Sequence, residues 1–166
     1  GTEDGVQAAR SGNIGCVRLT ERHMASAPAT SDQIQRVEAD TDAAIDTVLQ
    51  SVPLEKATRA VAVAGTATTI AAAALGLKTY DSEVINGSSI SVDTVQKTAE
   101  MLRSMTREER AALGYMHPGR VDVIGAGATI YARIMTRLRE ITEGNIDSVT
   151  VSEHDILDGI ALSQVR

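Results

Sequence analysis

The loop Gly65-Thr66-Ala67-Thr68 is the segment best suited to hold an anion. It follows an apolar run at residues 60–64 and precedes the small residues 70–75, a pattern that predicts a strand, a turn and a helix. The start of a helix offers backbone N–H groups and a partial positive charge, and the threonine hydroxyls add further donors. Residues 56–78 contain no Asp or Glu, so no carboxylate within this stretch would repel a phosphate.

A purely structural interpretation of this loop stays open. Gly65 would then make a tight turn and the threonines would cap a buried helix, and the loop lacks the lysine of a Walker motif. Two further helix starts, at Thr30 and Ser152, are followed by acidic residues in the first turn. A carboxylate there already neutralises the helix dipole, so these two starts are interpreted as structural caps.

Two arginines and two glycines complete the candidate site. Arg18 and Arg120 each lie beside a glycine-containing turn, and a guanidinium group suits bidentate binding of phosphate. They are candidate substrate-facing cations. Gly125 and Gly127 match a dinucleotide-binding fingerprint only weakly, because Ile130 occupies the third glycine position. We expect these glycines to let a helix pack closely or to line a nucleotide pocket.

The sequence nominates no catalytic base and no metal site. Glu21 and Asp122 follow the glycine-containing turns, but both are expected to be ion-paired structural groups. The three histidines are far apart in the chain, and the single cysteine, Cys16, has no second ligand at a metal-binding spacing.

The elements that must position these residues belong to a helix-rich α/β domain. Hydrophobic periodicity and capping signals predict strands at residues 6–10, 60–64 and 148–151. Helices are expected over residues 14–21, from Thr30 to near Pro53, at residues 70–75, after Ser91, after Thr106, over residues 121–138 and after Ser152. The strand at 60–64 is apolar at every position and is therefore expected to be covered on both faces.

Composition bounds the function classes. The 166 residues include 16 Lys and Arg against 22 Asp and Glu, a net charge of −6, and describe a single soluble domain over residues 1–166. The longest apolar run, at 70–75, is far shorter than the roughly 18–20 residues that cross a bilayer, and the first residues lead us to expect no leader peptide. We therefore expect no membrane association, and one cysteine suits a cytoplasmic location. The acidic charge and scarce aromatic side chains disfavour nucleic acid as a partner.

Four segments along the chain carry a combined signal. They are Ile14-Gly15-Cys16-Val17-Arg18-Leu19-Thr20-Glu21, Val61-Ala62-Val63-Ala64-Gly65-Thr66-Ala67-Thr68, Pro118-Gly119-Arg120-Val121-Asp122-Val123-Ile124, and Val149-Thr150-Val151-Ser152 with Gly159 beyond it. In this order, they resemble the exopolyphosphatase and guanosine-pentaphosphate phosphohydrolase family, Ppx/GppA. The likeness spans nearly the whole chain and favours the phosphate-binding interpretation of the loop at Gly65.

The resemblance implies an actin-like fold, in which two ribonuclease-H-like lobes face a cleft where a terminal phosphate is hydrolysed with Mg²⁺. This chain resembles the second lobe, with an incomplete sheet that lacks its first strands. The Asp-x-Gly-Gly-x-Ser-type phosphate loop, the N-terminal lobe and its catalytic Glu are absent from the sequence. We therefore expect the Mg²⁺ ligands to lie outside this chain and the chain alone to be inactive.

The function that the resemblance implies is hydrolysis of the terminal phosphoanhydride of polyphosphate, as part of an exopolyphosphatase. The alternatives are a guanosine pentaphosphate phosphohydrolase, a non-catalytic phosphate- or nucleotide-binding regulatory module, and a structural domain that binds neither. An incomplete sheet would expose an edge and apolar surface. We expect the partners to be polyphosphate or guanosine pentaphosphate, the missing N-terminal lobe, and a second copy in a homo-oligomer.

Overall fold

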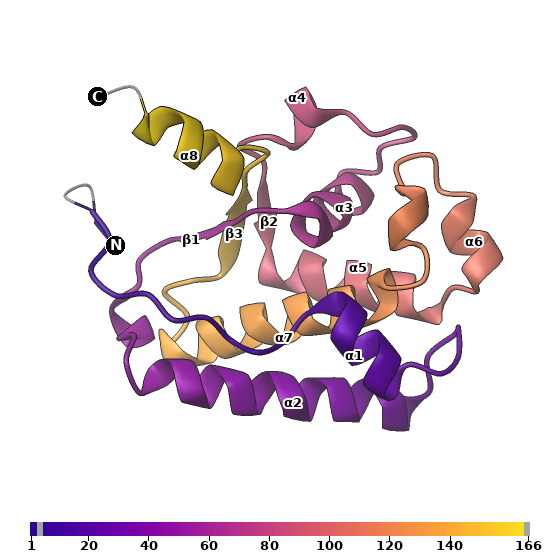
Figure 1. The fold of residues 1–166 in the computed structure, drawn as a ribbon. Coiled ribbons are helices and arrows are strands. Elements are labelled where there is room, and N and C mark those ends of the chain that lie inside the picture. The colour runs from indigo at the N-terminus through magenta and orange to yellow at the C-terminus, as the bar shows by residue number, and fades with distance from the viewer. Residues whose placement is uncertain (3–4, 165–166) are drawn as a thin grey trace.

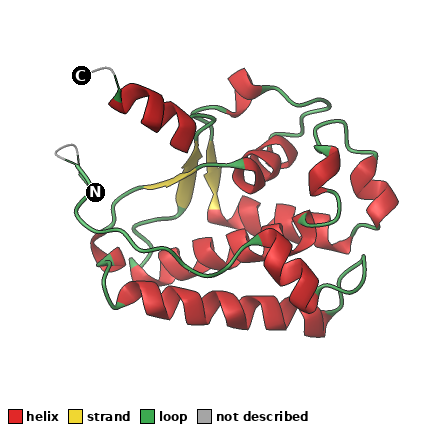
Figure 2. Ribbon diagram, viewed as in Figure 1, coloured by secondary structure: helices red, strands yellow, loops and turns green. Residues whose placement is uncertain are grey.

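The computed structural model describes residues 1–2 and 5–164, and helices dominate it (Figures 1 and 2). The α-helices are α1 (Cys16–His23), α2 (Ser31–Leu49), α3 (Gly65–Ala74), α4 (Ser82–Ile85), α5 (Val92–Ser104), α6 (Arg107–Ala111), α7 (Ile124–Ile141) and α8 (Ile156–Ser163), with 3₁₀ turns η1 (Leu54–Lys56) and η2 (Pro118–Arg120). The strands are β1 (Ala60–Ala62), β2 (Ser89–Ser91) and β3 (Ser148–Val151). The helix-rich α/β architecture expected from the sequence is confirmed.

The strands form one small sheet in the order β1-β3-β2. β1 pairs in parallel with β3, with Ala60 opposite Val149, and β2 pairs antiparallel to β3. The expected strand at 148–151 is thus confirmed as β3, and the one at 60–64 is confirmed as β1 over its first three residues. β1 lies at an edge of the sheet, which leaves its outer row of backbone groups without a strand partner in the described part of the chain.

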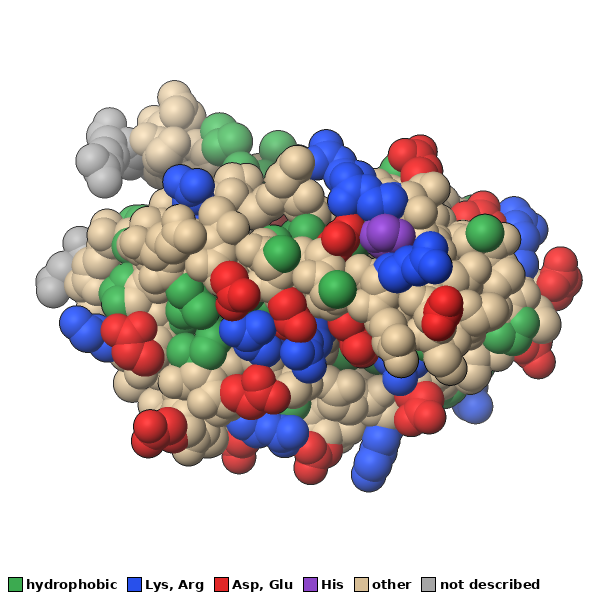
Figure 3. Space-filling view, turned by 90° about the horizontal axis from the view of Figure 1, so that it is seen from below, with side chains coloured by type: hydrophobic (Ala, Val, Ile, Leu, Met, Phe, Trp, Pro, Cys, Tyr) green, Lys and Arg blue, Asp and Glu red, His purple; other side chains and the backbone are tan. Residues whose placement is uncertain are grey.

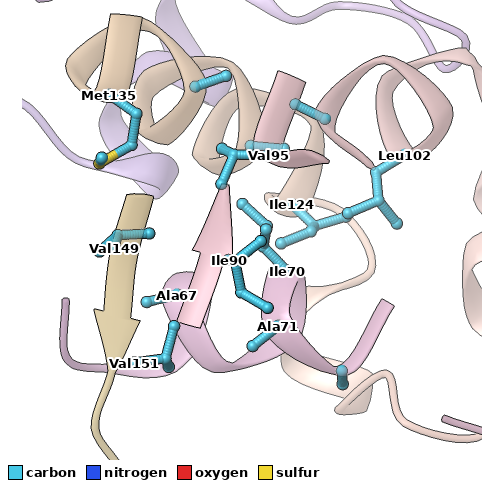
Figure 4. Packing of buried hydrophobic residues seen from close by; sticks show 14 of the residues in the cluster. Ala67, Ile70, Ala71, Ile90, Val95, Leu102, Ile124, Met135, Val149 and Val151 are labelled. Carbon is cyan, nitrogen blue, oxygen red and sulfur yellow. The ribbon is translucent and has the colours of Figure 1, made fainter. Parts of the chain in front are cut away.

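One face of the sheet is buried against helices (Figure 4). Val149, Val151 and Ile90 pack with Ile70 of α3 and Val95 of α5, all at most 4% exposed. Alanines on α3 let the helix lie close to the strands, because small side chains keep the interhelical and helix–sheet gaps narrow at native packing density.

The other face of β1 is open, contrary to the sequence expectation. Val61 and Val63 are 56% and 50% exposed, so the strand is covered on one face only. A run apolar at every position suits a strand buried on both faces, and here nothing in the described chain covers the second one. The last helix, α8, likewise buries none of its residues.

Helix α7 is the central element, because it is buried from two sides. Its partner on one side is α5, and α2 runs along the other side with α1 across one end (Figure 1). A second apolar cluster fills this layer with Leu19, Val37, Ala126 and Ile130. The face that includes α2 shows acidic and basic side chains interspersed rather than one large patch of a single sign (Figure 3).

Capping signals located most helix starts correctly. The capping box of Thr30 with Gln33 and that of Thr106 with Glu109 are both formed, and Ser91 accepts from Thr94 N–H. The expected cap at Ser152 is wrong. Its hydroxyl accepts from the N–H of His154, and Asp155 is the cap of α8 through a box with Asp158.

Two further expectations about strands are wrong. Residues 6–10 form no strand, and Val6 is 82% exposed, because this segment finds no neighbour in the sheet. Residues 89–91, for which the sequence predicts no strand, form β2, which is defined by its pairing with β3 and has a single buried apolar residue, Ile90. The helix expected over 121–138 begins at Ile124, after η2. Among the described helices, none has the length and apolar character of a membrane span.

Candidate anion-binding site

The turn from β1 into α3 is shorter than the sequence suggests. The helix begins at Gly65 itself and not at residue 70, so the expected five-residue turn is wrong. The change of direction falls on Ala64, whose φ of 69° lies in the region that L-residues rarely adopt. The helix start therefore lies directly at the carboxyl end of a parallel strand, where open α/β sheets bind ligands.

The first turn of α3 presents free donors. It has no acidic residue and no side-chain cap, and the N–H groups of Gly65, Thr66 and Ala67 donate to no acceptor in the described part of the chain. Gly65 and Thr66 are half-buried, whereas Ala67 and Thr68 are only 2% and 4% exposed. An anion would therefore reach the helix start from the side of its first two residues.

Arg120 lies directly against this helix start. A β-carbon built on Gly65 would come within 1.4 Å of Nη2 and 1.6 Å of Cζ of Arg120. The guanidinium thus occupies the space that any other residue at position 65 would need. No carboxylate pairs with it among residues 1–2 and 5–164. Gly65 and Arg120, which are 55 positions apart and were both predicted as site residues, are therefore in contact. The guanidinium gives this contact a net positive charge.

A pocket of about 370 Å³ opens beside Arg120. None of its lining residues is acidic: Thr68, Thr69, Tyr80, Gly114, Tyr115, Met116, His117 and Arg120. The Nδ1 atom of His117 accepts from the N–H of Gly119 at 3.1 Å. The neutral ring then carries its proton on Nε2, which is a second donor for a ligand in addition to Arg120.

Tyr80 forms another wall of this pocket and is held by an acid. Its hydroxyl donates to Oε1 of Glu153 at 2.5 Å. Burial and this hydrogen bond raise the pKa of Tyr80, while the nearby Thr68 and Arg120 act in the opposite direction. Neither Tyr80 nor His117 is among the site residues predicted from the sequence. The position of His117 directly before Pro118-Gly119-Arg120 was a signal for the histidine, but nothing marked Tyr80.

The threonine hydroxyls differ in what they can offer. Thr69 donates to the carbonyl of Gly65 at 2.7 Å, and Thr68 points to the same oxygen at 3.5 Å, so both hold the first turn of the helix. Thr66 faces α7 instead. A β-carbon on Gly127 would lie 3.0 Å from its Oγ1 and 3.2 Å from the Cβ of Cys16. Gly127 therefore lets α7 pack closely behind the loop.

Two other candidates lie elsewhere. Arg18 is exposed on α1 and lines neither this pocket nor a second one between α1, α6 and α7. Gly125 lies in that second pocket, where a β-carbon on it would meet Nη2 of Arg110 at 3.0 Å. Of the four candidate substrate-facing residues, the structure therefore brings Arg120 and Gly127 against the loop, and of these two only Arg120 lines the pocket beside it.

The two acids that follow the glycine turns have different environments. Asp122 pairs with Nε of Arg107 at 2.7 Å, as expected. Glu21 is exposed and takes part in no ion pair within the described residues, so that expectation is wrong. The described part of the chain also holds no group of three His, Cys, Asp or Glu side chains able to bind a metal. Its residues therefore do not fit a Mg²⁺ site.

A sequence model of the Ppx/GppA phosphatase family matches residues 1–164. The chain belongs to this family. Over 161 residues it is 45% identical to the protein named Exopolyphosphatase 2 in two strains of Mycobacterium tuberculosis, CDC 1551 and H37Rv. That match covers 97% of this chain and 50% of the relative, so the chain spans about half the length of these relatives.

Solved structures agree with this assignment. The crystal structure of an exopolyphosphatase-like protein is 42% identical, with a TM-score of 0.92, and the match covers 96% of this chain and 51% of that one. The PPX-GPPA enzyme of Aquifex aeolicus is 25% identical, with a TM-score of 0.82 and coverage of 98% and 51%. The sheet and helices described above are thus those of half a Ppx/GppA protein.

Proposed function

We propose that this chain is the second lobe of a two-lobed, actin-like hydrolase core and that it binds the terminal phosphates of inorganic polyphosphate. The observation that carries the proposal is the guanidinium of Arg120 seated against the bare start of α3 at Gly65. Backbone N–H groups, a helix dipole and an arginine with no carboxylate partner in residues 1–2 and 5–164 lie together at this helix start. Guanosine pentaphosphate offers the same terminal group and is the alternative substrate.

Two further findings support polyphosphate as the substrate. The relative with 45% identity is named an exopolyphosphatase, and the structure at 42% identity is described as exopolyphosphatase-like. The pocket beside Arg120 contributes His117 and Tyr80, which suit a phosphate chain that continues beyond its terminal group. We propose that both line the path of the second phosphate.

The proposed reaction needs groups that this chain does not supply. Water attacks the terminal phosphorus and the bridging P–O bond breaks. The products are orthophosphate and a polyphosphate chain that is one unit shorter. A carboxylate must orient the water and acids must hold Mg²⁺. No acid lines the pocket, and the described residues do not form a metal site. The catalytic carboxylate and the metal ligands are therefore proposed for the other lobe, and this chain alone is proposed to be inactive.

The decisive experiment is phosphate release by the full-length protein, from polyphosphate and from guanosine pentaphosphate, with and without Mg²⁺. Arg120→Ala should lower kcat/KM at least about a hundredfold, because a charge-assisted contact to the transferred phosphoryl is lost. Arg36→Ala, which removes an exposed arginine of α2, is the matched control and should have no effect. Full activity of the Arg120→Ala protein on both substrates would refute the proposal.

The same measurements separate the alternatives. Faster release from guanosine pentaphosphate than from polyphosphate would make the chain part of a pentaphosphate hydrolase. Phosphate binding without release from either substrate would favour the regulatory module. Phosphate release by residues 1–166 in isolation would contradict the assignment of the catalytic groups to another lobe.

A further inference from the structure

A second pocket, of about 210 Å³, lies between α1, α6 and the start of α7. It is lined on separate elements by Thr20, Ser26, Arg107, Arg110, Asp122 and Gly125, among others. It shares no lining residue with the pocket beside Arg120. The function proposed above makes no use of it.

The main feature of this pocket is a buried arginine that forms no ion pair within the described part of the chain. Arg110 is 3% exposed. Its Nε donates to the carbonyl of Leu102 at 2.8 Å and its Nη2 to that of Arg103 at 3.3 Å, while Nη1 has no acceptor in the described residues. A buried charge is costly when no opposite charge compensates it. The two carbonyls at the end of α5 offset only part of that cost.

The start of α7 adds unused donors to the same pocket. The helix has no acid in its first turn and no side-chain cap, and the N–H groups of Gly125 and Ala126 have no acceptor in the described part of the chain. Both residues line the pocket. Gly125 lets the Arg110 guanidinium approach the backbone, because a β-carbon would come within 3.0–3.4 Å of its Nη2, Nη1 and Cζ.

Thr20 supplies a second, independent observation that points to a ligand in this pocket. Its Oγ1 is buried and has no hydrogen-bond partner among the described residues, although Thr20 lines the pocket. A buried hydroxyl without a partner is unusual, and each instance calls for an explanation. A group that accepts hydrogen bonds within the pocket would satisfy Thr20, Arg110 and the free N–H groups together.

The charges at the rim favour an anion. Two arginines and one aspartate line the pocket, and Asp122 is already neutralised by Arg107, with Nε at 2.7 Å and Nη2 at 3.5 Å from its oxygens. The positive charge of Arg110 is therefore not neutralised by the aspartate of the pocket. Burial lowers its pKa, and Asp122 opposes this only through a longer-range interaction.

We propose that this second pocket binds a phosphate group, held by Arg110, the first N–H groups of α7 and the hydroxyl of Thr20. The site is distinct from the loop at Gly65. The phosphate could be free orthophosphate or the end of a larger molecule, since both present the same tetrahedral oxyanion. The inference does not depend on the function proposed above.

The test uses the full-length protein carrying Arg120→Ala, in which the first site is disabled. Titration of inorganic phosphate by calorimetry should still show one site. Adding Thr20→Val should weaken its affinity about tenfold, because one hydrogen bond to a charged group is lost. The stability of the free protein should not fall, since that hydroxyl has no partner. Thr47→Val, an exposed threonine of α2, is the matched control and should leave the affinity unchanged.

Parallel titrations with tripolyphosphate and a nucleoside monophosphate identify the source of the phosphate. Tighter binding of either than of orthophosphate would support the site and assign it to the end of a larger ligand. If the Arg120→Ala protein binds none of the three, or if Thr20→Val and Thr47→Val behave alike, the second site is refuted. Neither result would bear on the loop at Gly65.

Discussion

Position 65 tolerates only glycine as long as Arg120 keeps its place. The guanidinium lies within 1.4–1.7 Å of where a β-carbon would be, far inside van der Waals contact. The glycine is therefore required for a close approach between a side chain and a helix start, and not for an unusual φ angle.

Gly65→Ala should weaken phosphate binding at the first site about as much as Arg120→Ala, by roughly tenfold or more, because alanine expels the guanidinium. The double variant should be no worse than either single one, since both remove the same contact. Gly65→Ala, Arg120→Ala and the double variant are each made in the full-length protein that carries Thr20→Val, in which binding at the second pocket is weakened. Titration of orthophosphate into each protein measures the affinity of the first site. Additive losses would show that Gly65 and Arg120 act separately, and Gly12→Ala, where a β-carbon meets only contacts of 3.8 Å or more, is the control.

Ala64 carries the backbone strain of the site. Its φ of 69° with ψ of 170° belongs to a region that glycine adopts without cost. Ala64→Gly should therefore raise the free energy of unfolding by about 1 kcal/mol, after allowance for the greater freedom of glycine in the unfolded chain. Urea denaturation of the two proteins measures this. A less stable glycine variant would mean that Ala64 is held without strain.

At the scale of elements, the packing of α2 on α7 includes a small ionic network. Asp42 of α2 accepts from Nε and Nη2 of Arg133, both at 2.7 Å, and from Nη1 of Arg137 at 3.0 Å. The three side chains are 19–29% exposed. Hydrogen bonds from Arg133, then from Arg137, hold the pKa of Asp42 below its usual 3.8, although partial burial opposes this.

Asp42→Asn should cost about 1 kcal/mol of unfolding free energy at pH 7. Because the pKa of Asp42 is depressed in the folded state, its contribution is complete above pH 3.8 and is lost as the pH falls through the folded value. The stabilities of the two proteins should therefore converge in strong acid. Thermal unfolding at pH 7 and below pH 3 tests this. Asp93→Asn, at an exposed pair with Arg139, should change stability less.

The elements that sequence reasoning located are those with a local cause. Thr30 and Thr106 fix helix starts through their own capping boxes, β1 is a short apolar run, and β3 alternates buried valines with Ser148 and Thr150. β2 was not predicted, because its strand character comes from pairing with β3 and not from its own residues. The strand predicted at residues 6–10 was wrong for the converse reason, since a strand-like pattern forms no strand without a neighbouring strand.

About half of the candidate site was predictable from local sequence signals. The loop at Gly65 and Arg120 each carried a local signal, but their contact depends on the tertiary fold. Tyr80 reaches the site from a connecting segment with no motif. Arg110 lies in a stretch of charged residues, a pattern that predicts a solvated surface. Its burial follows instead from the packing of α5 and α7 around it.

At the scale of the whole molecule, the described surface carries an apolar region that a lone domain would not expose. Val61 of β1, Val63 just after it and four residues of α8 are 50–74% exposed. The α8 residues are Ile156, Leu157, Ile160 and Leu162. Unpaired sheet edges and apolar patches of this kind mark interaction surfaces. We propose that the other half of the full-length protein covers them.

Residues 1–166 in isolation should therefore self-associate, and Val61→Lys combined with Leu157→Lys should reduce this self-association, because charge on the patch opposes burial. Light scattering at increasing concentration measures the effect, with Thr47→Lys on exposed α2 as the control. A monodisperse monomer from the unchanged sequence would contradict it. In the full-length protein, the same double change should lower stability if these residues pack against the other half.

The contact between Gly65 and Arg120 also bears on how such chains diverge. A homologue that acquires any side chain at position 65 must give up the arginine at 120 or hold it in a different rotamer, whereas loss of the arginine first would leave position 65 free to drift. The two positions should therefore covary among family members, with glycine retained wherever the arginine is kept.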